Sequence, residues 1–236
     1  MTSSSLNAPR GKEQKGFIVK PWEVPGLLDG SITQLRRVMK PQPEFLPAPT
    51  NGVSWRHGKR VGWGQDYSHF ASHAVDRAPY AVGDVLYVKE TWGVGCRPCP
   101  VSGWYDGIEY KADVGLVDPL PCRNVDDVCF MEYASGWHSP ATMPRRFSRL
   151  SLEVTAVRPE RIQDVTDEDV IAEGILDGGC LHCGMNEPCT CAHPTPSRRD
   201  SYINRWMSTY GDASWHGNDW TWAYTIRPIS LSTGAP

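Results

Sequence analysis

Alternation of apolar and polar residues predicts strands in the second half of the chain. The clearest runs from Arg149 to Arg158, where every second residue is apolar. Its apolar face consists of Leu150, Leu152, Val154 and Ala156. The stretch Trp220 to Ile229 has the same period, with an apolar face of Trp220, Trp222, Tyr224 and Ile226. This period is typical of half-buried strands, and Val85 to Trp92, rich in β-branched and aromatic residues, predicts another.

Two helices have clear start signals. Thr166 can cap a helix that runs to about Ile175, with Asp169 three residues later in the position of a capping box. Ser197 starts the second, whose buried face is Ile203, Trp206, Met207 and Tyr210 at the spacing of one helical stripe. A short helix from Pro21 to Leu28 and an extended segment from Ile32 to Met39 complete the regular elements.

The remaining chain lacks a sustained period. Residues 41–80 and 93–140 are rich in Pro, Gly and aromatic residues, and we expect irregular insertions there, with a short strand at Ile108 to Lys111. Residues 1–15 predict a disordered tail, and 231–236 a C-terminal tail. We therefore expect one α+β domain over 16–230, a small mixed β-barrel or curled sheet with flanking helices and long loops.

Charge and hydropathy restrict the class of protein. The net charge of −3 excludes a strongly basic nucleic-acid coat but leaves room for a local basic patch. The first 16 residues contain no apolar signal region, and no apolar run approaches the roughly 20 residues of a membrane span. We expect a cytoplasmic protein without a membrane partner.

Four of the eight cysteines fall close together in a Gly-rich insertion over 177–196. They are Cys180, Cys183, Cys189 and Cys191, with His182 and His193 nearby. Since disulfides are disfavoured in the cytoplasm, this spacing predicts one structural zinc ion with four thiolate ligands. His193 could replace one thiolate, and a loop of reduced thiols is the alternative. For the other four, Cys96, Cys99, Cys122 and Cys129, a second metal site, a redox pair and no function all remain open.

Four segments, in this order, resemble the ASCH family, in particular its phage and prophage members. They are LLDGSITQLRRVMKPQP, VGDVLYVKETW, TMPRRFSRLSLEVTAVRPERIQDVTDEDVIAEGI and WMSTYGDASWHGNDWTWAYTIRPI. The resemblance implies a PUA-like β-barrel that binds RNA or another nucleic acid, in the host cytoplasm if the protein is phage-encoded. Some small members are amidohydrolases that act on acetylated cytidine. Of their catalytic Lys, Thr and Glu, this chain keeps only the Glu, as Glu173, and has Ile32 and Leu35 at the other two positions. Apolar side chains can neither transfer a proton nor attack a carbonyl, which argues against that hydrolysis.

Basic, aromatic and acidic residues in these segments are the candidate ligand contacts. The set is Arg36, Arg37, Lys40, Lys89, Glu90, Trp92, Arg145, Arg149 and Glu173, with Arg146 beside it. Arginines and lysines would contact phosphates, and an aromatic ring would stack on a base. Glu173 could read a base edge, or it could lie on a solvated helix face. Adjacent Arg36 and Arg37 on a strand point to opposite faces, so we expect one of them to line a pocket. Trp92 is either the stacking ring or part of the core.

The leading hypothesis is a module that recognises a nucleotide or a modified base in nucleic acid, with RNA favoured over DNA. A rearranged amidohydrolase or nuclease is the first alternative. A phage structural or host-interaction scaffold is the second.

The cysteine spacing generates a test of the insertion. We predict one tightly bound zinc ion per chain, measured by elemental analysis of freshly purified protein. Because metal binding and folding are coupled in such sites, Cys183→Ser should loosen residues 177–196 and leave the rest of the domain folded. Protein without zinc, and without a thiolate spectrum after cobalt substitution, would refute the site.

Overall fold

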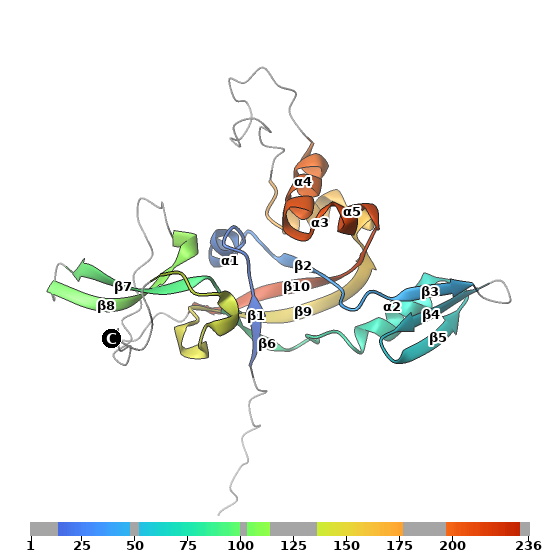
Figure 1. Cartoon of the computed structure of the whole chain (residues 1–236), viewed down its shortest axis with the longest axis horizontal. Coiled ribbons are helices and arrows are strands. Elements are labelled where there is room, and N and C mark those ends of the chain that lie inside the picture. Colours follow the sequence, from blue (N-terminus) through green and yellow to red (C-terminus); the bar gives the residue numbers. More distant parts are fainter. Residues whose placement is uncertain (1–13, 48–51, 100–102, 114–135, 177–196, 232–236) are drawn as a thin grey trace, which may run out of the picture.

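A five-stranded mixed sheet forms the centre of the molecule (Figure 1). The computed structural model describes residues 14–47, 52–99, 103–113, 136–176 and 197–231. The strand order is β1-β6-β9-β10-β2. The strands are β1 (Lys15–Ile18), β6 (Val85–Lys89), β9 (Leu150–Arg161), β10 (Trp220–Leu231) and β2 (Gln34–Val38). With helices packed on this sheet, the expected α+β class is confirmed.

The central sheet does not close into a barrel within the described residues. Strand β1 pairs parallel with β6, the other neighbours pair antiparallel, and β1 and β2 remain the two edges. The chain between them forms α1 (Val24–Asp29), which ends at Gly30 in the left-handed conformation with a φ of 79°. In place of a backbone ladder, the side chain of Arg37 on β2 donates a hydrogen bond to the carbonyl of Ile18 on β1.

The largest core lies against the predicted apolar faces of the sheet. Trp220, Trp222, Tyr224 and Ile226 of β10 all belong to it, which confirms the shared face predicted for this strand. The prediction for β9 holds through Val154 and is wrong at Ala156, which is exposed. Pairing of β9 with β10 shifts register between Thr225 and Ile226, and such a bulge turns the following residues to the opposite face.

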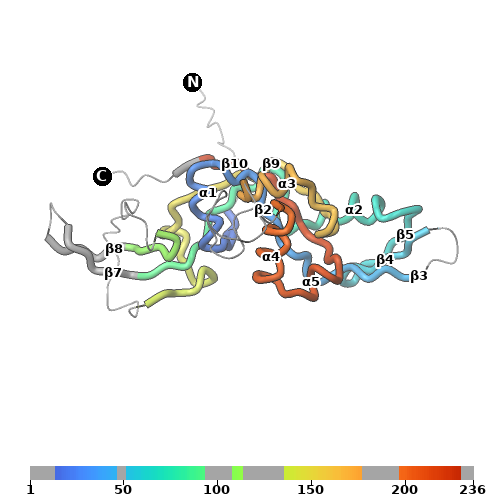
Figure 2. Tube along the Cα trace, turned by 90° about the horizontal axis from the view of Figure 1, so that it is seen from above, coloured from blue at the N-terminus to red at the C-terminus, as the bar shows by residue number. Residues whose placement is uncertain are grey.

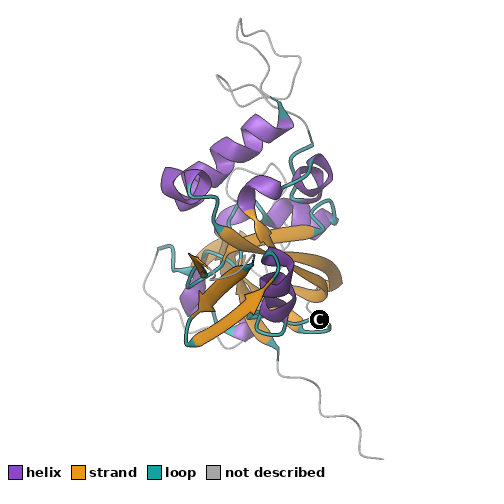
Figure 3. Cartoon of the chain, turned by 90° about the vertical axis from the view of Figure 1, so that its right-hand side faces the viewer, coloured by secondary structure: helices purple, strands orange, loops and turns teal. Residues whose placement is uncertain are grey.

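A helical layer covers one side of the sheet (Figure 3). It contains α3 (Asp167–Ala172), α4 (Arg198–Tyr210) and α5 (Asp212–His216). The capping box predicted at Thr166 is present, and Ser197 starts α4 with a second one. The three helices share a core that contains Val170 of α3, Trp206 of α4 and Trp215 of α5. None of the helices in the described ranges has both the length and the apolar character to cross a membrane.

Two further β-structures occupy opposite ends of the long axis (Figure 2). One end has a three-stranded sheet and a helix: β3 (Glu44–Pro47), β4 (Val53–His57), β5 (Arg60–Gly64) and α2 (Tyr67–Val75). The other end has a hairpin of β7 (Trp92–Cys99) and β8 (Gly103–Tyr110). Four 3₁₀ turns connect elements, at Lys111–Asp113, Pro140–Thr142, Arg145–Phe147 and Ile162–Asp164.

The expected irregular structure in 41–80 and in the first part of 93–140 is therefore wrong. In the first region the strands are only four or five residues long, and they are held by packing of Trp55 on Phe70 of α2, with ring centroids 5.4 Å apart. Tertiary packing of this kind overrides weak local signals. The four cysteines of the predicted zinc site lie outside the described residues, as do Cys122 and Cys129.

Candidate functional site

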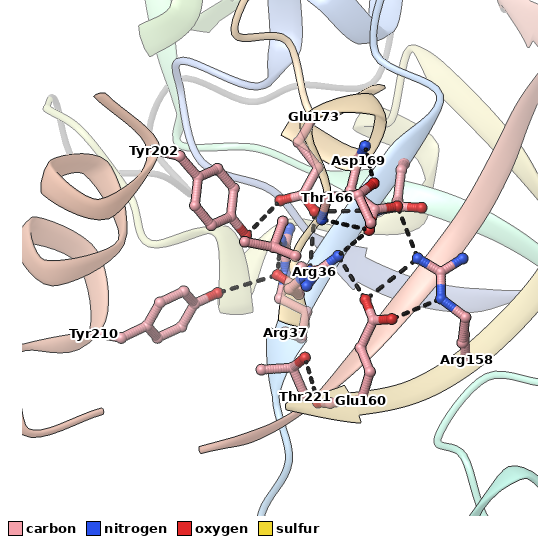
Figure 4. Close-up of polar contacts among 12 residues, drawn as sticks. Arg36, Arg37, Arg158, Glu160, Thr166, Asp169, Glu173, Tyr202, Tyr210 and Thr221 are labelled. Carbon is pink, nitrogen blue, oxygen red and sulfur yellow. Dashed lines mark hydrogen bonds and ion pairs between the residues drawn. The ribbon is translucent and has the colours of Figure 1, made fainter. Parts of the chain in front are cut away.

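A buried network of charges joins the sheet to the helical layer, with Arg36 at its centre (Figure 4). Arg36 on β2 is 2% exposed. Its Nη2 lies 2.6 Å from Glu160 Oε1 of β9 and 3.4 Å from Asp169 Oδ2 of α3. Its Nε donates to Oε1 of Glu173 at 3.0 Å. One guanidinium thus connects three carboxylates that belong to β9, to α3 and to the residue that ends α3.

Neutral donors complete the coordination of these carboxylates. Gln34, two residues before Arg36 on the same strand face, donates to Asp169 at 3.0 Å and to Glu173 at 3.1 Å. The hydroxyl of Tyr202 on α4 donates to the other oxygen of Glu173 at 3.1 Å. Glu173 therefore has contacts from a strand and from a second helix.

The network holds more negative than positive groups. Two arginines, Arg36 and Arg158, face the three carboxylates, and Arg158 contacts Glu160 and Asp169 at 2.7 Å each. Burial raises the pKa of Glu173 despite its contacts with Arg36 and Gln34. Burial also pushes the pKa of Asp169 upward, but hydrogen bonds from Thr166, Gln34 and Arg158 outweigh it and lower this pKa.

A small cavity adjoins Arg36 and Glu173. Its volume is about 20 Å³, room for about one water molecule, and Tyr202 and Trp206 line it from α4. Nη1 of Arg36 is buried without a hydrogen-bond partner among the described residues. In this conformation Glu173 has no space beside it for a nucleobase, so the expected reading of a base edge by Glu173 would require the cavity to open.

A larger, open groove lies along strands β1 and β6. Its volume is about 410 Å³. It is lined by Gly16, Phe17, Ile18, Arg37, Tyr80, Tyr87, Lys89 and Ala141. We call it the tyrosine groove. Two of the predicted ligand contacts, Arg37 and Lys89, meet here, together with two tyrosines that the sequence analysis did not select.

The β-strand period places Tyr87 and Lys89 on the same face of β6. Both side chains extend across β1 at Gly16, where a Cβ atom would come within 2.8 Å of Lys89 Cδ and 2.9 Å of the Tyr87 hydroxyl. Glycine at this position therefore leaves the space that the tyrosine ring and the lysine stem occupy. The Lys89 ammonium donates to the carbonyl of Ala141 at 2.6 Å.

Arg37 forms a wall of the groove rather than a free cation. It makes four hydrogen bonds through Nη1 and Nη2: two to the carboxylate of Glu23 at 2.8 Å, and one each to the carbonyls of Arg36 and Ile18 at 2.9 Å. Its guanidinium also stacks 4.8 Å from the centre of the Phe17 ring. Arg37 thus fixes the position of β1 relative to β2. Its contact with a phosphate remains a prediction.

Glu90 and Arg149 pair with each other. Arg149 donates to both oxygens of Glu90, at 3.0 and 2.8 Å, and to both oxygens of Asp113, at 2.8 and 2.9 Å. The guanidinium also lies 4.0 Å from the centre of the Tyr110 ring. Burial raises the pKa of Glu90 against the effect of Arg149. This pair holds together the segments around β6, β8 and β9.

The remaining predicted contacts lie in three separate places. Trp92 is 1% exposed and stacks on His138 in a second core with Phe147, which agrees with the packing role left open for it. Lys40 is exposed just after the end of β2. The amide of the preceding Met39 donates a hydrogen bond to the carbonyl of Trp220. Arg145 is exposed in the 3₁₀ turn that follows Ala141.

Two kinds of residue at these sites were not among the candidates chosen from the sequence. Tyr87 stands inside the strand VLYVK, and the period of two that pairs it with Lys89 was readable from the sequence. By contrast, Glu160, Arg158 and Tyr202 join Arg36 only through the fold. Within the described ranges no group of three or more His, Cys, Asp or Glu side chains is arranged to hold a metal ion.

Comparisons with protein-family models, with curated proteins and with solved structures found no match.

The buried network generates a stability prediction. Arg36→Met should destabilise the protein by about 3–5 kcal/mol at pH 7.5, because it leaves the buried carboxylates of Asp169 and Glu173 and the half-buried Glu160 without their main cation. Loss of this cation should raise the pKa values of Asp169 and Glu173 in the folded state. The loss should be fully present above these values and should shrink as pH falls toward 5. Urea unfolding at both pH values measures it.

Arg158→Met is the matched control. This side chain is 47% exposed and pairs with two of the same carboxylates, so its removal should cost about 1 kcal/mol or less. Equal losses for the two variants, or a loss for Arg36→Met that does not depend on pH, would contradict the assigned role of Arg36.

Proposed function

We propose that this protein is a binding module for a nucleotide or a base in single-stranded nucleic acid, RNA favoured, and that the tyrosine groove holds the ligand. The observation that carries the proposal is the arrangement of Tyr87 and Lys89. An aromatic ring and an ammonium group stand side by side on one strand face, over an open hollow of about 410 Å³. A base can stack on the ring, and a phosphate can bind the ammonium group beside it.

The aromatic side of the groove suits an unpaired base. Bases of single strands stack on tyrosine rings, and each stack contributes about 1–3 kcal/mol. Tyr80 is held for this purpose by a hydrogen bond from its hydroxyl to the carbonyl of Gly16, at 2.8 Å, and by Phe17, with ring centroids 5.1 Å apart. Such rigid rings lose little entropy when a base packs on them.

The cationic side suits a small number of phosphates. Lys89 is half-buried and donates to a carbonyl, and no carboxylate within the described ranges forms an ion pair with its ammonium group. Arg145 and Arg146 are exposed four and five residues after Ala141, which lines the groove. A net charge of −3 is compatible with a local patch of this size.

The resemblance to the ASCH family supports the same ligand class, and we propose a PUA-like domain in which β1 and β2 approach through the side chain of Arg37. The zinc-binding insertion stays part of this proposal. Ile32 and Leu35, the two departures from the hydrolytic pattern, are 3% and 2% exposed in the main core. This burial favours binding over hydrolysis by the family mechanism.

The proposal predicts weak, salt-dependent binding to single-stranded RNA. Only a few phosphates can be contacted, so the salt slope should correspond to about two to four released counterions. Lys89→Ala should weaken binding to every sequence and lower the slope by about one. Tyr87→Ala should weaken binding by about 1–3 kcal/mol and leave the slope unchanged, because stacking releases no counterions. Fluorescence anisotropy at several salt concentrations measures both.

Two variants are controls. Tyr87→Phe keeps the ring and should bind as the wild type does. Lys59→Ala removes an exposed lysine from the β4–β5 turn, away from the groove, and should leave affinity and slope unchanged. If the wild-type protein binds neither RNA, DNA nor free nucleotides at low salt, the scaffold alternative replaces this function.

A further inference from the structure

A second open groove lies where β9 ends and β10 begins. Its volume is about 530 Å³, and it is lined by Tyr67, Arg161, Asp164, Gly217, Asn218 and Trp220. We call it the Arg161 groove. Ser151, which pairs with Tyr87, and Arg161 are ten residues apart on β9, about 33 Å along an extended strand. The two grooves therefore belong to opposite ends of this strand.

Three aromatic rings hold the guanidinium of Arg161. Its central carbon lies 5.0 Å from the ring centre of Trp220, 5.3 Å from that of Phe45 and 5.7 Å from that of Tyr67. Nη1 also donates to the carbonyl of Asn218 at 2.8 Å. Cation–π contacts and one hydrogen bond fix the orientation of the side chain and leave its charge in place.

Arg161 lacks the carboxylate partner that three other arginines have, and among the described residues it shares this with the half-buried Arg199 and Arg205. Arg36, Arg37 and Arg149 all pair with carboxylates inside the protein. Among the described residues no carboxylate forms an ion pair with Arg161. Asp164 lines the same groove, so its negative charge opposes an anion there to some degree.

An oriented guanidinium without a carboxylate partner is a common means of binding phosphate, because its planar fork matches two phosphate oxygens. Tyr67 stands beside it with 48% of its surface exposed, in position to stack on a planar ring. The pairing of a phosphate-binding fork with an exposed aromatic ring fits a nucleotide better than an isolated anion.

We propose that the Arg161 groove is a second nucleotide-binding site, in which Arg161 binds the phosphate and Tyr67 stacks on the base. The choice of a nucleotide over another phosphorylated ring compound rests on the function proposed above. Adenosine monophosphate, uridine monophosphate, and a nucleotide within an RNA strand share this chemistry. A strand that reaches both ends of β9 would occupy both grooves.

Titration of the full-length ¹⁵N-labelled protein with adenosine monophosphate tests the site. The backbone amides of Gly217 and Asn218 should shift, and Arg161→Gln should lower the affinity at least tenfold. Tyr67→Ala should lower it severalfold, because it removes the exposed ring and one of the three cation–π contacts of Arg161. Lys89→Ala, in the other groove, should leave this affinity unchanged. Unfolding curves establish that each variant is folded under the assay conditions.

Adenosine and inorganic phosphate separate the two contributions. Each alone should bind at least tenfold more weakly than adenosine monophosphate. Equal binding of inorganic phosphate would overturn the stacking part, and an Arg161→Gln variant of unchanged affinity would overturn the site. If Arg161→Gln lowers the affinity for a twelve-nucleotide RNA, one RNA strand occupies both grooves. If only the mononucleotide responds, the site binds free nucleotides.

These results are independent of the tyrosine groove. Loss of the monophosphate shifts at Gly217 and Asn218, with RNA binding through Tyr87 intact, refutes only the second site. If adenosine monophosphate still binds at Arg161 but Tyr87→Ala does not change RNA affinity, only the tyrosine groove is refuted as a binding site.

Discussion

The fold depends on a charge that water would otherwise solvate, the guanidinium of Arg36. Moving such a group into the protein interior costs several kcal/mol, which close carboxylates and hydrogen bonds must offset. Here Glu160, Asp169 and Glu173 supply this compensation from β9, α3 and the end of α3. The helical layer sits on the sheet in the arrangement that brings all three carboxylates to the guanidinium.

The orientation of Arg36 also determines how Arg37, the next residue on β2, contributes to the tyrosine groove. Consecutive side chains of a strand point to opposite faces, so an Arg36 that faces the helices directs Arg37 to the other face. There Arg37 binds Glu23 and the Ile18 carbonyl and stacks on Phe17. Strand β1 is thereby held close to β2 at the open edge of the sheet. Gly16 on that strand then leaves room for Tyr87 and Lys89. A pair of arginines thus connects the interior to the candidate binding surface.

The sequence predicts the parts of this structure that depend on local patterns. The capping box at Thr166, the helix start at Ser197 and the apolar face of β10 follow from periodicity and turn chemistry, and they are confirmed. The small sheet around Trp55 was missed because its strands are short and are stabilised by contact with α2. At the candidate site, Lys89 was predicted and Tyr87 was not. The pairing of Arg36 with Glu160 joins residues 124 positions apart, and no local rule could predict that contact.

We propose above all that nucleic acid binds over Tyr87 and Lys89. Photocrosslinking with a short RNA that carries 4-thiouridine tests it most directly, because mass spectrometry then identifies the peptide that lies against the base. We expect crosslinks in the peptides that contain Tyr80 and Tyr87, and their loss with Tyr87→Ala. Crosslinks confined to the β7–β8 hairpin or to the helical layer, with none at either tyrosine, would contradict it.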